Sequence, residues 1–219
     1  MSTLSQLRDR VEQLLQDVSN DIFTTGLLDE CLRQALDEYS QVSPLTMETV
    51  ITLPGDGHEI ALDSLPNLSE VLEVCYPYDT TGAAETCLPN QVRGFRLLWD
   101  DARAVLWLET LGGVQPQQGE QVRLWYAQPH TIQDLDGGDC TTLPTPHETM
   151  LVVGAAGHAA LSRAIDLVEV AGTDLYAIGL LGAWGRAAQK RWYAFLESLR
   201  RQQARRGPAW GRGWNSSDR

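Results

Sequence analysis

The spacing of apolar residues changes twice along this 219-residue chain, from a helical period to an alternating one and back. Residues 1–45 and 146–206 have the helical period, whereas residues 46–128 have the alternating period of strands. Because a helix pair with an apolar stripe must bury that stripe, the two helical segments are expected to pack on each other. This pattern therefore predicts a β region inserted into a helical domain.

The N-terminal segment is predicted to form a helical hairpin. Its first helix has apolar residues at intervals of three and four, at Leu4, Leu7, Val11, Leu14 and Val18. Its second helix follows the candidate caps Thr24 and Thr25 and ends before Pro44, which has no amide donor. One face of that helix is apolar, and its residues are Leu28, Cys31, Leu32, Ala35, Leu36 and Tyr39.

The middle segment, residues 46–128, reads as short strands. Residues 50–53 and 59–62 flank the turn Pro54–Gly57 and are predicted to form a β-hairpin. A second short turn, Asp100–Arg103, joins two of the later strands. These later strands are expected at 71–76, 95–99, 105–108 and 122–126. Mostly local connections favour a small antiparallel sheet, sandwich or open barrel.

The C-terminal segment is predicted to form a second helical hairpin. Thr145, Pro146 and Glu148 fit a capping box that opens a helix running to about residue 170. Gly154 and Gly157 lie inside this helix, where each costs about 1 kcal/mol relative to alanine, so close approach of a neighbouring helix is expected there. The last helix uses the stripe Leu181, Trp184, Ala188, Phe195 and Leu199. The fold class is α+β, a four-helix core with an inserted antiparallel β-subdomain.

Residues 129–145 form a predicted acidic loop between the β insertion and the second helical hairpin. Its carboxylates at Asp134, Asp136 and Asp139 resemble part of a calcium loop. The twelfth position, which should hold a bidentate Glu, is Thr145 instead, so an acidic turn is the favoured interpretation. Cation binding by residues 134–139, and with it a metal-dependent hydrolase, stays open as an alternative.

Charge is segregated along the chain. The formal net charge is −12, but residues 186–219 hold nine basic residues against Glu197 and Asp218. Residues 186–219 therefore carry +7 and the preceding residues carry −19. Lys190 is the single lysine, so almost all positive charge is guanidinium, which pairs bidentately with carboxylate or phosphate. An acidic body with an arginine-rich end indicates a partner bound at that end.

Three interpretations of this end, which includes the tail 207–219, are weighed. As a protein anchor it would use Trp and Arg, the residues most enriched at interface hot spots; the candidates are Arg200, Arg201, Arg205, Arg206, Trp210, Arg212 and Trp214. As a nucleic-acid grip it would stack Trp192, Trp210 and Trp214 on bases. As a solubilising tail it would need no tryptophan. The anchor is favoured, because the acidic body repels a polyanion.

No catalytic signature is found in the sequence. The nucleophile-elbow, zinc-protease, P-loop and dinucleotide-binding motifs are all missing, so neither an enzyme nor a cofactor is expected. Among the four histidines only His158 is expected to be interior, as a packing residue. The four cysteines are interpreted as reduced thiols, although Cys75 and Cys87 would approach each other if their segments pair.

A soluble, cytoplasmic protein without membrane association is expected. The longest uninterrupted apolar run, Met150–Gly157, is eight residues, whereas a membrane-spanning helix needs about 20. The N-terminus lacks the basic patch and apolar run of a signal peptide.

The overall pattern resembles the head–tail adaptor (neck or connector) proteins of tailed bacteriophages. The segments that carry this resemblance are Leu4–Arg8, Leu14–Asp17, Leu28–Ser40, Leu53–Ile60, Val122–Ala127 and Pro146–Glu148. The resemblance extends to about residue 200 and includes no catalytic motif.

The resemblance implies a structural virion protein that assembles as a ring, commonly of about twelve subunits. Such a ring sits under the portal protein of a DNA-filled head, receives the next neck or tail component, and lets genomic DNA pass without specific binding. In this family the C-terminal segment commonly docks into the portal, which suits the Arg/Trp end. The protein would be assembled in the host cytoplasm and located in the virion neck. The alternative function is a nucleic-acid-binding protein that grips DNA through the same end.

Overall fold

The computed structural model describes residues 2–19, 21–79, 86–87, 91–101, 103–168 and 175–206, with the backbone alone at 86–87 and 205–206. The chain divides into two compact units. A helical unit combines the residues up to Pro44 with those from His130 onward, and a β unit spans Leu45–Pro129.

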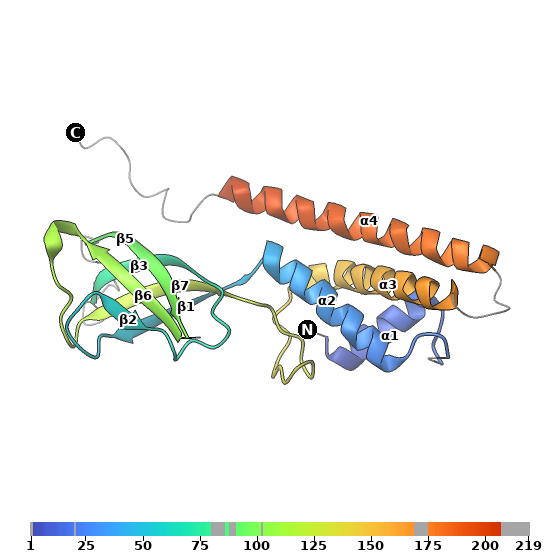
Figure 1. The fold of residues 1–219 in the computed structure, drawn as a ribbon, viewed down its shortest axis with the longest axis horizontal. Helices are drawn as coiled ribbons and strands as arrows, with labels where there is room; N and C mark the ends of the chain where they lie inside the picture. Colours follow the sequence, from blue (N-terminus) through green and yellow to red (C-terminus); the bar gives the residue numbers. More distant parts are fainter. Residues whose placement is uncertain are drawn as a thin grey trace. The chain divides into compact units, whose positions relative to one another are not determined.

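Within its described residues, the helical unit forms four helices (Figure 1), which are α1 (Leu4–Leu15), α2 (Thr25–Val42), α3 (Thr145–Val168) and α4 (Leu175–Arg206). Helix α3 lies at the centre and contacts the other three helices. The α+β fold class, with N- and C-terminal helical pairs packed together and a β insertion between them, is therefore confirmed.

All four helices contribute apolar side chains to one core. Its fully buried large members include Leu7, Leu28, Leu32, Leu151 and Trp192. Complete burial of one such side chain is worth about 1.5–3 kcal/mol. The loop before α3 adds Ile132 and Leu135 to the same cluster, so this loop packs onto the helices.

Helix α1 is shorter than predicted. It ends at Leu15 because Gln16 adopts a left-handed conformation with φ of 59°. The carboxylate of Asp17 then accepts hydrogen bonds from the amides of Phe23 (2.7 Å) and Ile22 (2.9 Å), which fixes the turn into α2. Val18, predicted to lie on the apolar stripe, is therefore outside the helix and 72% exposed.

The predicted capping box of α3 is also wrong. Helix α3 begins at Thr145, and the carboxylate of Glu148 turns toward the N-terminus of the chain. It accepts hydrogen bonds from the Ser2 amide (3.1 Å), the Ser2 hydroxyl (2.7 Å) and Arg10 (3.1 Å). Glu148 thus ties the segment before α1 to the first turn of α3.

The described part of the β unit forms two antiparallel sheets. The first has the order β1-β7-β3-β4, with β1 (Leu45–Thr52), β7 (Gln121–Gln128), β3 (Glu70–Asp79) and β4 (Thr86–Cys87). The second has the order β2-β6-β5, with β2 (Glu59–Ala61), β6 (Arg103–Thr110) and β5 (Val92–Asp100). A short 3-10 helix, Leu111–Gly113, follows β6. Both sheets contribute to one apolar cluster that includes Ile60, Leu106, Leu108, Val122 and Leu124.

The predicted hairpin between residues 50–53 and 59–62 does not form. Strand β1 pairs with β7, where Val50 lies opposite Arg123, whereas β2 pairs with β6, where Ile60 lies opposite Leu106. The two segments therefore belong to different sheets. The second predicted turn is confirmed, because β5 and β6 form a hairpin that pairs Asp100 with Arg103.

Cys75 is disulfide-bonded, so the interpretation of all cysteines as reduced thiols is wrong for this residue, while Cys31 and Cys140 are free. Helix α3 is long and apolar enough to cross a membrane by length and composition, but 56% of its most apolar 18-residue stretch is buried within the protein. Burial against other helices accounts for that apolar composition in a core helix.

Candidate partner-binding site

Helices α3 and α4 approach each other closely at glycines. A Cβ on Gly154 would lie 2.8 Å from Cδ2 of Trp192, and one on Gly157 would lie 3.1 Å from the amide nitrogen of Gln189. On α4, a Cβ on Gly185 would lie 2.9 Å from Cγ of Leu161. The structure thus places both glycines expected to pack, Gly154 and Gly157, against the neighbouring helix.

The three contacts pair Gly154 with Trp192, Gly157 with Gln189 and Leu161 with Gly185, so α3 and α4 run antiparallel in a single register. Extended to the first residue of α3, this register places Thr145 opposite Arg201. Helix α4 continues to Arg206, so its last turn projects about 8 Å beyond α3 at 1.5 Å per residue (Figure 1). Among the α4 side chains that the structure describes, Leu199 is the last buried one, and residues 200–204 are all exposed.

The exposed end of α4 after Leu199 carries the first part of the predicted anchor. Arg200 and Arg201 pair with Glu197 at 3.9 Å and 3.1 Å, and their side chains are 68% and 72% exposed. Exposed ion pairs of this kind contribute about 0–1 kcal/mol, so both guanidinium groups can exchange Glu197 for another partner. Arg205 and Arg206 belong to the last turn of α4, but their side chains are outside the described residues, as are Trp210, Arg212 and Trp214.

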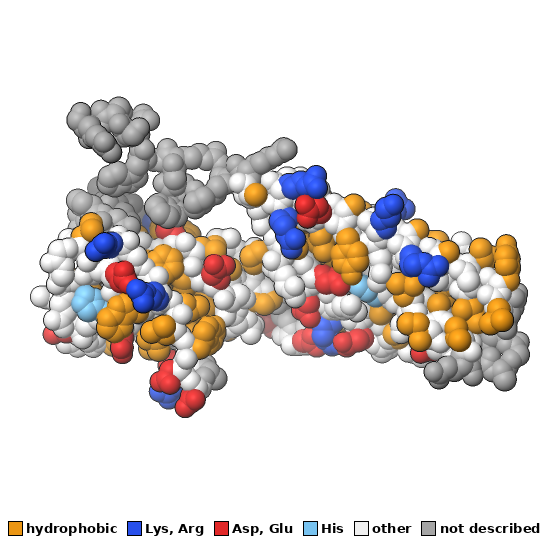
Figure 2. All heavy atoms as spheres, turned by 45° about the horizontal axis from the view of Figure 1, so that its top comes forward, with side chains coloured by type: hydrophobic (Ala, Val, Ile, Leu, Met, Phe, Trp, Pro, Cys, Tyr) orange, Lys and Arg blue, Asp and Glu red, His pale blue; other side chains and the backbone are white. Residues whose placement is uncertain are grey.

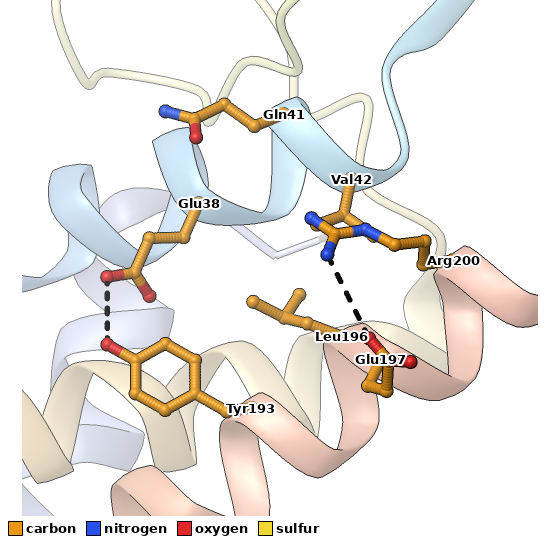
Figure 3. A pocket seen from close by; sticks show the side chains of 7 residues that line it. All are labelled: Glu38, Gln41, Val42, Tyr193, Leu196, Glu197 and Arg200. Carbon is orange, nitrogen blue, oxygen red and sulfur yellow. Dashed lines mark hydrogen bonds and ion pairs between the residues drawn. The ribbon is translucent and has the colours of Figure 1, made fainter.

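A groove lies between the ends of α2 and α4, beside Arg200 (Figure 3). Its volume is about 290 Å³, and its lining residues are Glu38, Gln41, Val42, Tyr193, Leu196, Glu197 and Arg200. The groove combines two carboxylates and one guanidinium with the apolar surface of Val42 and Leu196. Such mixed chemistry suits a polypeptide segment with both charged and apolar side chains.

Glu38 connects this groove to the helical core. Its Oε2 accepts a hydrogen bond of 2.6 Å from the indole Nε1 of Trp192, and its Oε1 accepts one of 3.3 Å from the hydroxyl of Tyr193. Burial together with the Glu38 charge raises the pKa of Tyr193, so its hydroxyl stays protonated. A carboxylate beside an apolar core is tolerated here because hydrogen-bond donors satisfy both of its oxygens.

His158 completes the polar network around Glu38. Its Nδ1 lies 3.0 Å from Nε2 of Gln189, which can only donate, so Nε2 of His158 carries the proton toward Glu38 at 3.3 Å. The network therefore joins α2, α3 and α4. Sequence reasoning missed Glu38, although it shares the helical spacing of Cys31, Ala35 and Val42 on α2.

A second polar cluster surrounds Tyr39, near the end of α2. The Tyr39 hydroxyl lies 2.6 Å from Nδ1 of His147, and Nδ1 of His130 lies 3.1 Å from Oγ1 of Thr142. Burial lowers the pKa of both imidazoles and raises the pKa of Tyr39, so the phenol donates to a neutral His147. His130 is only 7% exposed, which corrects the expectation that His158 alone is interior.

One carboxylate of the acidic loop, that of Asp136, pairs with Arg33 of α2. Both carboxylate oxygens of Asp136 accept hydrogen bonds of 2.7 Å from Arg33, and these bonds lower the pKa of Asp136. Within the residues that the structure describes, no group of three or more His, Cys, Asp or Glu side chains is arranged to hold a metal ion. Arg33 thus takes the place that a cation would occupy at Asp136.

The nucleic-acid interpretation loses one of its three tryptophans, because Trp192 is fully buried and unavailable for stacking on a base.

No protein-family model matches this sequence, and comparison with curated proteins gives no match either. The site is therefore interpreted from its own geometry, which is an exposed arginine-rich helix end beside a mixed polar and apolar groove.

Proposed function

We propose that this chain is a structural subunit of the head-to-tail adaptor ring of a tailed bacteriophage, without catalytic activity. In this role it docks under the portal protein, binds the next neck or tail component, and belongs to a ring of about twelve copies. It is assembled in the host cytoplasm and ends in the neck of the virion. The arginine-rich end of the chain is the portal-side anchor.

The proposal rests above all on one observation: α4 continues beyond Leu199, and its described side chains there, Arg200 and Arg201 among them, are exposed. A helix end without apolar contacts gains nothing from packing within its own subunit. Its guanidinium groups, together with Arg205, Arg206 and the tail that follows, suit the acidic or polar surface of a second protein. Trp210 and Trp214 supply the aromatic residues typical of interface hot spots.

The negative charge of the rest of the chain favours a channel through which DNA passes without being bound. Residues 1–185 carry −19, and like charges repel over a Debye length of about 8 Å at physiological salt. A ring lined by such subunits would let a polyanion pass without retaining it. This property fits a channel for genomic DNA better than a binding protein for DNA.

The competing function is DNA binding through the same arginines. The exposure of Arg200 and Arg201 favours it, since exposed guanidinium groups also pair with phosphates. If it is correct, the full chain will bind duplex DNA with an affinity that falls steeply with salt. Absence of binding at low salt would remove this alternative.

The test is co-sedimentation with the portal protein encoded by the same genome. We expect the full chain to sediment with the portal, and expect a chain truncated after Gly207 to remain folded but stay in the supernatant. Arg200→Ala with Arg201→Ala should weaken binding about tenfold or more. Lys190→Ala with Arg191→Ala, two exposed basic residues earlier on α4, is the matched control and should bind as the wild type does. Unchanged sedimentation of the truncated chain would contradict the proposal.

A further inference from the structure

The first three turns of α4 are apolar on every side. The segment Leu175–Gly185 contains no charged residue, and its polar side-chain groups are limited to the hydroxyl of Tyr176 and the indole N–H of Trp184. A helix that is apolar all round is normally buried all round. One face of this segment packs within the helical unit, through Ile178, Gly182 and Gly185.

The other faces are open to solvent. Leu175 is 75% exposed, Tyr176 is 74% exposed and Leu180 is 55% exposed. Ile165 and Val168, at the end of α3, are 68% and 63% exposed. Figure 2 shows apolar side chains gathered over the end of the helical unit where α4 begins. Contiguous exposed apolar surface of this kind marks an interaction site, unlike isolated apolar residues.

Two apolar depressions flank this part of α4. One, of about 430 Å³, lies toward α3, and its lining residues are Leu161, Ala164, Ile165, Val168, Ile178, Gly179, Gly182 and Arg186. The other, of about 260 Å³, lies toward α1 and is lined by Leu14, Leu15, Gln16, Leu181 and Trp184. At about 100° per residue, the α4 residues of the two depressions point to opposite sides of the helix.

A ridge separates the two depressions on the outer face of α4. Tyr176, Leu180 and Ala183 follow one another at helical spacing along it, and all three are exposed. The same subunit therefore presents an apolar ridge and, beside it, an apolar depression of a size to receive large side chains. Complementary apolar surfaces at different places on one molecule produce head-to-tail contacts between copies.

We infer that the first half of α4 is the contact between adjacent copies of this chain, with the ridge of one copy seated in the α3–α4 depression of the next. An isologous pair needs one surface, whereas a closed ring needs two different surfaces on each subunit, and the ridge and the α3–α4 depression supply them. Only the closure of these contacts into a ring rests on the proposed function. Self-association of the chain itself can be measured without the portal protein.

Two further observations favour a second copy as the occupant. Gly179 lies within α4 with no atom within 4 Å of the position of a Cβ, although glycine inside a helix costs about 1 kcal/mol. A helix from a neighbouring copy that approaches closely at Gly179 would offset that cost. In addition, copies with a net charge of −12 repel each other, so they associate most readily through a face without charges, as Leu175–Gly185 provides.

The test measures the mass of the full-length chain by light scattering across concentration. Leu180→Glu places a charge on the ridge, and Ala194→Glu places the same charge on an exposed site later on α4 as the matched control. We expect the wild type and Ala194→Glu to assemble, and expect Leu180→Glu to need about tenfold or more higher concentration to do so. Circular dichroism establishes that both variants are folded.

Hydrogen exchange of the wild type gives a second measurement that does not depend on a variant. Amides 175–187 should exchange more slowly at high than at low protein concentration, while those of 190–200 should not change. A wild type that stays monomeric at all concentrations would overturn the inference, as would assembly of Leu180→Glu at the wild-type concentration. If the chain stays monomeric and binds anionic vesicles through residues 175–187, the partner of this surface is a membrane and not a second copy of the chain. Assembly without portal binding would leave this inference standing and refute the proposed function.

Discussion

The indole of Trp192 lies directly against Gly154, so that a Cβ on residue 154 would come within 2.8 Å of Cδ2. The same indole donates a 2.6 Å hydrogen bond to Glu38. One side chain of α4 is thus held by α3 through shape and by α2 through a polar contact. This double constraint fixes the register of α4 against α3, and hence the place of the exposed Arg200 and Arg201 beside the start of α3.

Replacement of Gly154 tests the shape constraint. Gly154→Ala should destabilise the protein by about 1–3 kcal/mol, because the added methyl group meets the fully buried Trp192 ring, which has no room to move. Urea unfolding at low protein concentration measures the loss. Gly179→Ala is the control, since nothing lies near its Cβ position, and it should stabilise the monomer by about 0.5–1 kcal/mol. Equal stability of Gly154→Ala and wild type would contradict this packing.

Replacement of Glu38 tests the polar constraint. Glu38→Ala should cost about 1–3 kcal/mol, because the buried Nε1 of Trp192 and Nε2 of His158 lose their acceptor. The change should also shift the Trp fluorescence of the native state. Asp37→Ala, which removes an exposed carboxylate from the same turn of α2, should lie within about 0.5 kcal/mol of wild type. A Glu38→Ala protein as stable as the Asp37→Ala protein would refute the network.

Asp17 predicts the response to acid. Backbone hydrogen bonds, above all from Phe23, lower the pKa of Asp17 in the folded state. A carboxyl group with a lowered folded pKa adds stability above its unfolded pKa of about 3.9, and that stability is lost as pH falls through the folded pKa. Asp17→Asn should therefore be less stable than wild type at pH 7, and the difference should shrink in acid.

The measurement is urea unfolding at a series of pH values from neutral to about pH 3. Asp9→Asn, an exposed carboxylate on α1, serves as the control and should stay close to wild type throughout. A constant difference between Asp17→Asn and wild type across the series would show that Asp17 acts without its charge.

The acidic loop predicts the response to calcium. Because Arg33 occupies both oxygens of Asp136, calcium at about 1 mM should leave the melting temperature unchanged. Arg33→Ala should free the carboxylate but cost only about 0–1 kcal/mol, since Arg33 and Asp136 are both partly exposed. A melting temperature of the wild type that rises with calcium and saturates would contradict this prediction and show that the loop binds calcium.

Much of the fold was predictable from the sequence, because helical stripes depend on local spacing. The four helices and the β5–β6 turn follow from such patterns. The pairing of β1 with β7 was not predictable, since alternation shows that a strand forms but not which strand it joins. The end of α1 depends on the left-handed Gln16 and on the contacts of Asp17, which the apolar stripe through Val18 conceals.

The candidate site was predictable in part. The exposed Arg200 and Arg201 follow from the charge pattern. The groove at Glu38 does not, because the sequence does not show which hydrogen-bond donors satisfy a carboxylate on an apolar helix face. Trp192 shows the reverse error. Its place in an arginine-rich segment favoured a binding role, whereas the period of α4 turns it into the core.

The most direct test of the adaptor role is the mass of the full-length protein by light scattering, measured alone and mixed with the portal protein from the same genome. The account predicts one discrete large complex with the portal, in which the copies of this chain form a closed ring. A protein whose mass is the same with and without the portal would contradict the adaptor role.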